Sequence, residues 1–528
     1  MLSKIFAMAL QGADAFRICV EVSVSNGIGN QITGLPDDAI KESLCRIGIA
    51  LTDNGFFMPR TRLVINMAPA GVRKIGTSFD LAITVGILIA SGQISDIGKL
   101  KNYVVVGEIG LDGSIHPVPG ALCLASRAKD EGFKGIVLPD TNANEAALVD
   151  GIQVFSVTHL RELIQFINCD GSMKPLSRSR KIKFAEPDAT LDYKDVKGQR
   201  AVKRALEIAA TGGHNAILLG PPGAGKTMLA KRLPSIMPPM TIDEALETTK
   251  IYSVSNIAGP FTKLITERPF RSPHHTSSDV ALVGGGPIPF PGEISLAHNG
   301  ILFLDELPEF KRSTIETLRQ PLEEKKVLIA RAKMSVEYPS SFMLIAGANP
   351  CFCGYFGHPI RKCTCSRRAL YWYRRRISGP LLERIDLHVE VDSVSIGDLA
   401  EQNESRESSA TIRDRVIAAR QIQTERFLRS NVICNANIPD RNIESFCSLD
   451  SIAKKFLFQN INELQLSARS YTRILRIART IADLSANPVI EIQHVAEALH
   501  FRALDKPFII PPGKKNVVKR NSNFSFAV

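Results

Sequence analysis

The segment with the clearest capacity for chemistry is residues 220–227, which read Gly-Pro-Pro-Gly-Ala-Gly-Lys-Thr. It matches the GxxxxGK[ST] phosphate-loop pattern completely, follows the apolar stretch 215–219 and precedes a helical pattern. In such a loop, backbone N–H groups surround the β-phosphate, Lys226 contacts the β- and γ-phosphates, and the Thr227 hydroxyl binds Mg²⁺. A Gly-Pro-rich turn before a helix is the alternative interpretation. The context favours a binding site for ATP made of Gly220, Pro221, Pro222, Gly223, Ala224, Gly225, Lys226 and Thr227.

Polar residues that could complete this site follow two later apolar stretches. Asp305 and Glu306 end the stretch 301–304, and Asn349 comes just after the next one. Asp305 would hold Mg²⁺, and Glu306 would polarise the water that attacks the γ-phosphate. Asn349 would orient the same water. The alternatives are that the two acids cap the helix that follows, and that Asn349 starts an Asn-Pro turn.

A third group that could do chemistry is a cluster of cysteines. Four of the ten cysteines fall within one short segment, in two Cys-x-Cys pairs. Four thiolates on one loop form a suitable tetrahedral ligand set for Zn²⁺, although C-x₂-C is the more usual spacing. Reduced thiols that pack a loop are the alternative, because the overall cysteine usage is not that of a disulfide-rich protein. The candidate ligands are Cys351, Cys353, Cys363 and Cys365.

Directly after the cysteines, arginines alternate with aromatic residues in the segment 367–376. This mixture suits single-stranded nucleic acid, whose phosphates attract arginine and whose bases stack on aromatic rings. A solvated helix face turned toward a neighbouring subunit explains the pattern nearly as well. The DNA candidates in this segment are Arg374, Arg375 and Arg376.

Strands and helices must position these residues, and the sequence patterns predict where those elements lie. Residues 1–170 alternate between the two and indicate one α/β domain, whereas 171–189 are basic and poor in apolar residues, as in a linker. Residues 190–395 contain strands that are apolar on both faces, which indicates a second α/β domain with a covered parallel sheet. Helical patterns fill 396–505, and 506–528 form a basic tail. The predicted fold class is therefore α/β and multidomain, with a helical third domain.

Length and composition agree with this organisation. A chain of 528 residues suits about three domains. With 44% hydrophobic and 22% charged residues, the chain is not collagen-like or wholly disordered. The net charge of +12 favours an anionic partner such as nucleic acid where the charge is clustered. The longest apolar run, 81–90, is too short to span a membrane and no export signal is expected, so we predict a cytoplasmic protein without membrane contact.

Taken with the segments 268–275, 291–298 and 378–386, the nucleotide-site residues resemble the magnesium-chelatase-like AAA+ ATPases, and among them the ComM/YifB family. The resemblance extends from Val20 to about Leu504. It implies a Lon-protease-like domain of the ribosomal S5 type, an AAA+ P-loop core and a helical lid. It also implies a homo-oligomeric ring, a hexamer, that uses ATP and Mg²⁺ to move on DNA. In this family such movement promotes branch migration during natural transformation and homologous recombination.

The same resemblance assigns catalytic roles to three residues. Asn349 is similar to sensor 1, Arg384 to the arginine finger that reaches a neighbouring subunit's γ-phosphate, and Arg469 to sensor 2. A planar, fixed cation stabilises the charge that spreads over the γ-phosphate oxygens in the transition state. A surface or helix-capping cation is the alternative for each arginine, and Arg473 and Arg476 share the predicted helix of Arg469.

Two insertions resemble those of this AAA+ branch and of replicative MCM helicases. Residues 284–298 are similar to the helix-2 insert, and 327–338 to the pre-sensor-1 hairpin. The second segment alternates as two strands should, with Arg331 and Lys333 near its tip. A basic hairpin that projects into a ring channel would grip DNA phosphates without reading bases. An ordinary hairpin with a solvated cationic tip is the alternative.

The first domain resembles Lon-type peptidases but lacks one of their two catalytic residues. The segment 74–80 lies where those enzymes have the serine loop, which makes Ser78 the equivalent serine. Aligning 117–122 with their lysine segment places Leu122 at the lysine position. Ser-Lys chemistry needs an amine that takes the hydroxyl proton, so we expect no peptidase activity.

Three functions fit the sequence to different degrees. The first is an ATP-driven DNA motor, which the basic hairpin, the arginine–aromatic segment and the resemblance favour. The second is a chelatase-type ATPase that remodels a protein partner for metal insertion, which would need further subunits. The third is an ATP-dependent peptidase, which Leu122 disfavours.

Overall fold

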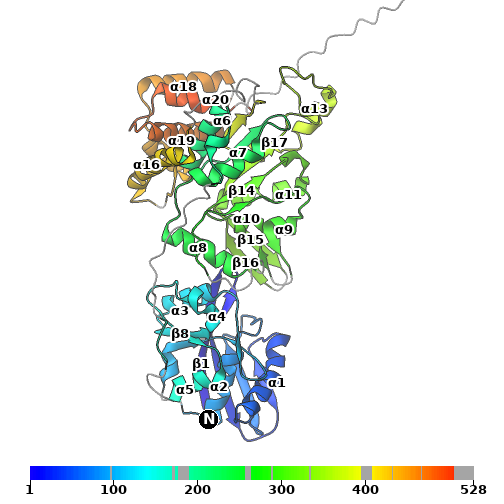
Figure 1. The fold of residues 1–528 in the computed structure, drawn as a ribbon, viewed down its shortest axis with the longest axis vertical. Helices are drawn as coiled ribbons and strands as arrows, with labels where there is room; N and C mark the ends of the chain where they lie inside the picture. Colours follow the sequence, from blue (N-terminus) through cyan, green and yellow to red (C-terminus); the bar gives the residue numbers. More distant parts are fainter. Residues whose placement is uncertain are drawn as a thin grey trace, which may run out of the picture.

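The computed structural model describes residues 1–95, 98–168, 173–176, 190–255, 263–286, 289–331, 334–393, 407–430, 432–464, 466–502 and 504. Lys333, the tail and all but four residues of the predicted linker lie outside these ranges. Figure 1 shows an elongated molecule with the amino-terminal domain at one end. Among the described residues, no helix is long and apolar enough to cross a membrane.

The amino-terminal domain is built on a seven-stranded mixed sheet. β1, β2 and β4 pair in antiparallel fashion, while β5, β8 and β9 continue the sheet from β1 in parallel. In sheet order the strands are β3 (Asn30–Thr33), β4 (Arg62–Ala68), β2 (Asp14–Ser25), β1 (Leu2–Gln11), β5 (Tyr103–Val105), β8 (Gly135–Pro139) and β9 (Gln153–Val157). A small hairpin joins β6 (Glu108–Ile109) and β7 (Ile115–His116). The helices are α1 (Asp38–Asp53), α2 (Asp80–Ala90), α3 (Ala121–Asp130), α4 (Asp140–Ala146) and α5 (Leu160–Asn168).

The second domain contains a five-stranded, wholly parallel sheet. Its strands, in sheet order, are β11 (Phe270–Arg271), β14 (Ile301–Leu304), β17 (Met343–Ala348), β10 (Ala216–Leu219) and β18 (Leu387–Glu390). The apolar residues of the three central strands are almost all buried, as in a parallel sheet that is covered on both faces. The helices are α6 (Arg200–Gly212), α7 (Lys226–Arg232), α8 (Ile242–Ser253), α9 (Asp279–Val283), α10 (Glu293–Leu296), α11 (Arg312–Glu316), α12 (Arg319–Glu324), α13 (Arg367–Arg374) and α14 (Gly379–Leu382). The predicted α/β fold class is confirmed.

The described residues of both predicted insertions include short strands. The first contains the short pair β12 (Gly284–Gly285) and β13 (Phe290–Pro291) followed by α10. The second is an antiparallel hairpin of β15 (Lys326–Arg331) and β16 (Met334–Pro339). One face of this hairpin is buried through Val327, Ile329, Val336 and Tyr338. The hairpin therefore has one packed face and one solvent face, on which Leu328 is half exposed.

The carboxy-terminal helices pack on the second domain beside α6 (Figure 1). They are α16 (Ser409–Phe427), α17 (Ile443–Phe446), α18 (Ser451–Leu464), α19 (Ala468–Leu484) and α20 (Ile492–His500). Ile474 of α19 and Val495 of α20 belong to the same apolar cluster as Leu218 of β10 and Leu387 of β18. The helices thus share a core with the parallel sheet.

The amino-terminal domain contacts the second domain through α3 and the turn between β1 and β2. The Gly120 N–H donates to the Ser253 carbonyl at 3.2 Å, and Lys250 of α8 donates to the Ser126 hydroxyl at 2.9 Å. In the β1–β2 turn, a Cβ on Gly12 would lie 2.4 Å from a methyl of Val336. The hairpin formed by β15 and β16 is therefore packed against the amino-terminal domain.

Candidate nucleotide-binding site

The predicted phosphate loop leaves β10 and leads into α7. Gly223 and Gly225 have φ values of +79° and +88°, which glycine adopts without the steric cost of a Cβ. The Lys226 ammonium lies inside the loop and donates to the carbonyls of Gly220 at 2.7 Å and Pro221 at 3.1 Å. Burial lowers the pKa of Lys226, and the nearby carboxylates oppose that shift.

Asp305, at the end of β14, faces the phosphate loop across β17. The Thr227 hydroxyl donates to its carboxylate at 2.5 Å. A Cβ on Gly347 would lie 2.6 Å from the other carboxylate oxygen, so β17 needs glycine where it passes Asp305. A hydroxyl and a carboxylate are hard oxygen ligands of the type Mg²⁺ prefers, so these two residues fit a magnesium site.

Glu306 precedes the short 3-10 helix Leu307–Glu309 but does not cap it through its side chain. Its backbone is left-handed, with φ of +51°, and its side chain caps no helix and is about half exposed. The nearest ring nitrogen is Nδ1 of His275, 3.6 Å from the Glu306 carboxylate. Sequence reasoning missed His275, although the segment 268–275 had been singled out.

Asn349 joins this group from the end of β17. Its side-chain oxygen accepts a hydrogen bond from the Lys226 ammonium at 3.0 Å. Lys226, Thr227, Asp305 and Asn349 thus meet at the carboxyl edge of the parallel sheet, where ligands of open α/β sheets bind. The arrangement can hold a nucleoside triphosphate with its γ-phosphate between Lys226 and Asn349.

Arg384 lies at the opposite edge of the same sheet. β10 and β18 run in parallel from Ala216 and Leu387 to Leu219 and Glu390, and Arg384 precedes this span whereas the phosphate loop follows it. Four strand residues separate the two edges by about 13 Å. The Arg384 carbonyl accepts from the Asn215 side chain at 3.1 Å, which fixes it at the amino edge.

The side chain of Arg384 is largely buried beside one acid. It forms an ion pair with Glu323 of α12 and donates to the Pro380 carbonyl at 2.6 Å. Its Nε is buried and has no hydrogen-bond partner within the described part of the chain. An arginine with an unpaired buried donor can be stabilised further by an added acceptor.

Arg469, the predicted sensor 2, lies next to Arg384 rather than next to the phosphate loop. Its guanidinium forms an ion pair with Glu383 at 2.6 Å, and two-thirds of its side chain is exposed. The structure therefore brings the two predicted catalytic arginines together at the amino edge and brings neither to Lys226.

Asp386 is a structural residue that sequence reasoning missed. It forms an ion pair with Arg473 of α19, and its carboxylate accepts from the Asn215 N–H at 3.2 Å. Burial opposes its ionisation, but Arg473 and His214 outweigh burial and hold the pKa of this carboxyl well below its usual range. Asp386 thus joins the C-terminal helices to the strand that carries the phosphate loop. The segment 378–386 contained it, but its partners are distant in sequence.

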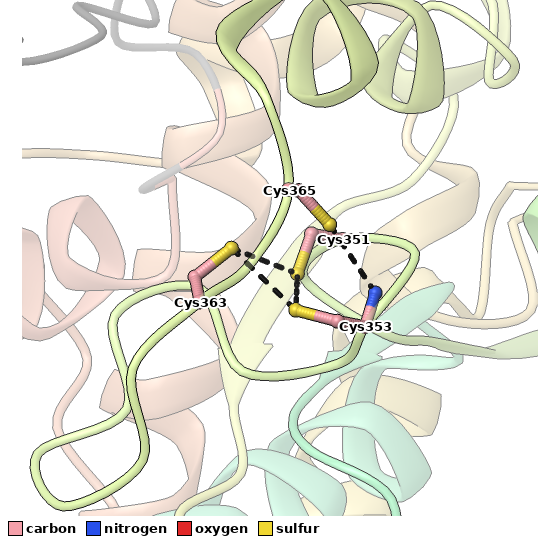
Figure 2. A group of neighbouring side chains, drawn as sticks. All are labelled: Cys351, Cys353, Cys363 and Cys365. Atoms are coloured by element: carbon pink, nitrogen blue, oxygen red, sulfur yellow. Dashed lines mark hydrogen bonds between the residues drawn. The ribbon is translucent and has the colours of Figure 1, made fainter.

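The four predicted metal ligands come together on the loop between β17 and α13. Figure 2 shows the cysteine side chains pointing toward one another, and all four sulfur atoms lie within 4.8 Å of each other. Cys353 Sγ lies 3.3 Å from Cys351 Sγ and 3.5 Å from Cys363 Sγ, and the Cys353 N–H points at Cys365 Sγ at 3.4 Å. Burial raises the pKa of Cys353, but the N–H groups of Tyr355 and Thr364 outweigh burial and lower it to about 5.

The predicted DNA-contact arginines have different surroundings. Arg376 donates to Glu309 at 2.7 Å, and Arg374 lies 5.7 Å from the centre of the Phe356 ring. Arg375 instead lies over Tyr371 and Trp372, whose rings are about half exposed. Arg331 is exposed and lies close to the first insertion, since a Cβ on Gly285 would be 2.8 Å from its guanidinium.

In the amino-terminal domain, the positions of the Lon-type dyad hold Ser78, just before α2, and Leu122 in α3. Leu122 is fully buried in the domain core, and its backbone N–H donates to Glu145 at 2.9 Å. A leucine side chain has no group that accepts a proton. The absence of peptidase activity remains a prediction.

The sheet order and the site define a P-loop ATPase of the AAA+ class, in which β17 lies between the strand of the phosphate loop and that of Asp305. Three family models match the chain. They are described as magnesium chelatase, subunit ChlI, over 192–399; subunit ChlI of Mg-chelatase, over 20–142; and subunit ChlI C-terminal, over 406–502.

Similar proteins identify the family within the AAA+ class to which the chain belongs. The protein YifB of Salmonella typhimurium is 41% identical over 510 residues, which cover 96% of this chain and 98% of the relative. The competence protein ComM of Haemophilus influenzae is also 41% identical, over 95% of this chain and 98% of the relative. Lon protease 2 of Bacillus subtilis is 28% identical over 31% of this chain and 32% of the relative. The chain belongs to the magnesium-chelatase-like ComM/YifB family of AAA+ ATPases.

Proposed function

We propose that this protein is an ATP-driven motor that assembles into a homo-oligomeric ring, a hexamer, and moves on DNA. The observation that carries the proposal is the position of Arg384, at the sheet edge opposite the phosphate loop of its own chain. An arginine there serves ATP hydrolysis only when a neighbouring subunit presents its nucleotide to that edge. Each active site would then lie between two subunits, as in a ring.

In this proposal the residues of one chain bind and orient ATP. Lys226 neutralises the β- and γ-phosphates, and Asn349 and Glu306 orient and polarise the attacking water. When bound through Thr227 and Asp305, Mg²⁺ would neutralise charge on the phosphate oxygens. The neighbour's Arg384 would stabilise the charge that develops on the γ-phosphate, and Arg469 beside it would act on the same site.

The exposed ring pair Tyr371 and Trp372 supports DNA as the polymer on which the motor moves. Arg375 lies 5.2 Å from the centre of the Tyr371 ring, so a cation and two aromatic faces share one exposed patch on α13. Such patches hold single-stranded DNA through phosphate contact and base stacking, without sequence preference. We assign Arg331 and Lys333 of the hairpin a phosphate-contacting role as well. The similarity to the competence protein ComM supports a role in competence. We propose that the motor acts on recombining DNA in the cytoplasm.

We further propose that the four cysteines hold Zn²⁺. Tetrahedral zinc–sulfur bonds of about 2.3 Å separate the sulfur atoms by about 3.8 Å. The sulfur atoms of Cys351, Cys353 and Cys363 are separated by 3.3, 3.5 and 3.7 Å, close to that value. Zinc analysis of the purified protein tests this site, and a content well below one ion per chain would contradict it.

The rate of ATP hydrolysis with and without DNA tests the motor. We expect single-stranded or branched DNA to stimulate hydrolysis, and we expect added salt to weaken the effect because phosphate contacts release counterions. The control is the Lys226→Ala variant, which should show no hydrolysis under any condition. Absence of both stimulation and salt-sensitive DNA binding would contradict a DNA motor and favour a chelatase-type ATPase that remodels a protein partner.

A further inference from the structure

The four-cysteine cluster lies at the junction of the segments that form the nucleotide site. Cys351 follows Asn349 by two residues and is fully buried. The Gly354 N–H donates to the Cys351 carbonyl at 3.0 Å, which closes a tight turn. This turn lies against the phosphate loop, because a Cβ on Gly354 would be 2.4 Å from Cδ of Pro222.

The cluster also contacts α13 and the loop that follows Glu306. The Phe352 ring packs against Tyr373 of α13 with the ring centres 4.7 Å apart. The Arg376 guanidinium lies 4.9 Å from the centre of the Phe352 ring and donates to Glu309. Phe352 of the cysteine loop thus packs on α13, and Arg376 links this loop to Glu309, in the segment that follows Glu306.

This loop has no regular structure of its own to hold it in place. Between the end of β17 and the start of α13, no residue is in a helix or strand, and all of these residues are described. Ordering the backbone of such a loop costs conformational entropy, and a cross-link offsets part of that cost. Metal–thiolate bonds supply such a cross-link, and their binding energy becomes folding energy for the loop.

We infer that a zinc ion on Cys351, Cys353, Cys363 and Cys365 holds Asn349 and the phosphate loop in register, so that ATP affinity depends on the metal. This inference rests on the proposed zinc site but is independent of DNA. The ion would act by holding the turn Cys351–Gly354 against Pro222, at a distance from the reacting atoms.

The structure offers a matched pair of glycines that tests this coupling. Gly354 and Gly357 lie in the same loop with φ of +81° and +79°, so alanine is equally strained at both positions. A Cβ on Gly354 meets Pro222, whereas a Cβ on Gly357 has nothing within 4 Å. We expect Gly354→Ala to keep its zinc but bind a fluorescent ATP analogue about tenfold more weakly, and Gly357→Ala to keep both. Equal ATP affinity in the two variants would overturn the contact with Pro222 as the route of coupling.

Metal removal tests the same inference without a substitution. The full chain is treated with a zinc chelator at fixed excess Mg²⁺, and ATP affinity is measured before treatment, after it and after Zn²⁺ is returned. We expect a loss of about tenfold that Zn²⁺ restores, with unchanged circular dichroism of the helices. Unchanged affinity in metal-free protein would overturn the coupling and leave the zinc site standing. Protein isolated without zinc, from cells supplied with it, would overturn both, and neither result bears on DNA stimulation.

Discussion

The Lys226 ammonium and the Asn349 side-chain amide are joined by a hydrogen bond of 3.0 Å. This bond connects the phosphate loop after β10 to the end of the neighbouring strand β17. Both groups face the position that the γ-phosphate would occupy, but they are expected to differ in what they do there. We expect Lys226 to bind the phosphates and Asn349 to act on the attacking water.

Substituting these two residues should therefore separate binding from turnover. Lys226→Ala should abolish ATP binding because the loop loses its only cation within the segment 220–227. Asn349→Ala leaves Lys226 its two carbonyl acceptors, so ATP binding should persist while hydrolysis falls about 100-fold. Equilibrium binding and steady-state hydrolysis measure the two effects. An equal loss of binding in both variants would show that Asn349 is needed to shape the loop.

A mixture of two inactive variants should recover activity if Arg384 acts across subunits. The Lys226→Ala chain keeps a competent Arg384, and the Arg384→Ala chain keeps a competent phosphate loop. In a mixed ring, some interfaces contain both intact groups, and hydrolysis should rise above the sum of the two separate rates. If mixing gives no more than that sum, while the variants are shown to assemble together, the arginine serves its own chain.

Removing the charge of Glu306 should trap bound nucleotide. Glu306→Gln keeps the size of a side chain that is about half exposed, so the loop geometry should be retained. We expect ATP to bind normally and hydrolysis to fall by about 100-fold or more, because the attacking water loses its base. A quench-flow measurement of a single turnover shows whether the hydrolysis step itself is slowed. A rate near that of the unchanged protein would exclude Glu306 as the base.

The ion pair between Asp386 and Arg473 should make stability depend on acid pH. The folded-state pKa of Asp386 is lowered, so its stabilisation is present above the unfolded value of about 3.9 and is lost as the pH falls below it. Asp386→Asn should cost about 3 kcal/mol at neutral pH, since it leaves the Arg473 charge partly buried without its partner.

Urea unfolding of both proteins at neutral pH and below about pH 4 checks this prediction. The difference between the two free energies of unfolding should shrink in acid, because only the unchanged protein has the carboxylate to lose. A difference that stays constant would mean that the substitution acts through packing rather than charge.

The exposed patch on α13 should bind single-stranded DNA. Trp372→Ala and Arg375→Ala should each weaken binding of an oligonucleotide by about tenfold, in line with the usual value of one stacked base. Lys454→Ala, which removes an exposed cation of α18, is the charge-matched control and should bind normally. If all three variants bind alike, α13 does not lie in the DNA path.

The nucleotide site could be predicted from the sequence because each part is local. The phosphate loop is defined by eight consecutive residues, and Asp305 needs only an apolar strand before it. The antiparallel hairpin of β15 and β16 was likewise predictable, because alternation with a short turn specifies it within one segment. For these parts, the residues that determine the local geometry lie close together in the sequence.

Other parts depend on contacts between residues far apart in the chain. Nothing in the sequence around Arg469 indicates that Glu383 is its partner, because that pairing depends on how α19 packs on the sheet edge. The two arginines that follow α13 look alike in sequence, yet Arg376 is paired with Glu309 while Arg375 is stacked on exposed rings. The strand Leu2–Gln11 likewise depends on β2, with which it pairs along its whole length.

The apolar cluster shared by the parallel sheet and the carboxy-terminal helices has a practical consequence for dissecting the protein. The cluster contains Tyr193, near the start of the second domain, and Phe501, just after the last carboxy-terminal helix. A fragment cut after residue 395 would expose the flank of α6 and would aggregate instead of behaving as a minimal ATPase. We therefore expect the second domain and the carboxy-terminal helices to fold as one unit that extends at least to Arg502, whose guanidinium donates to the carbonyl of Asp386 at 3.0 Å.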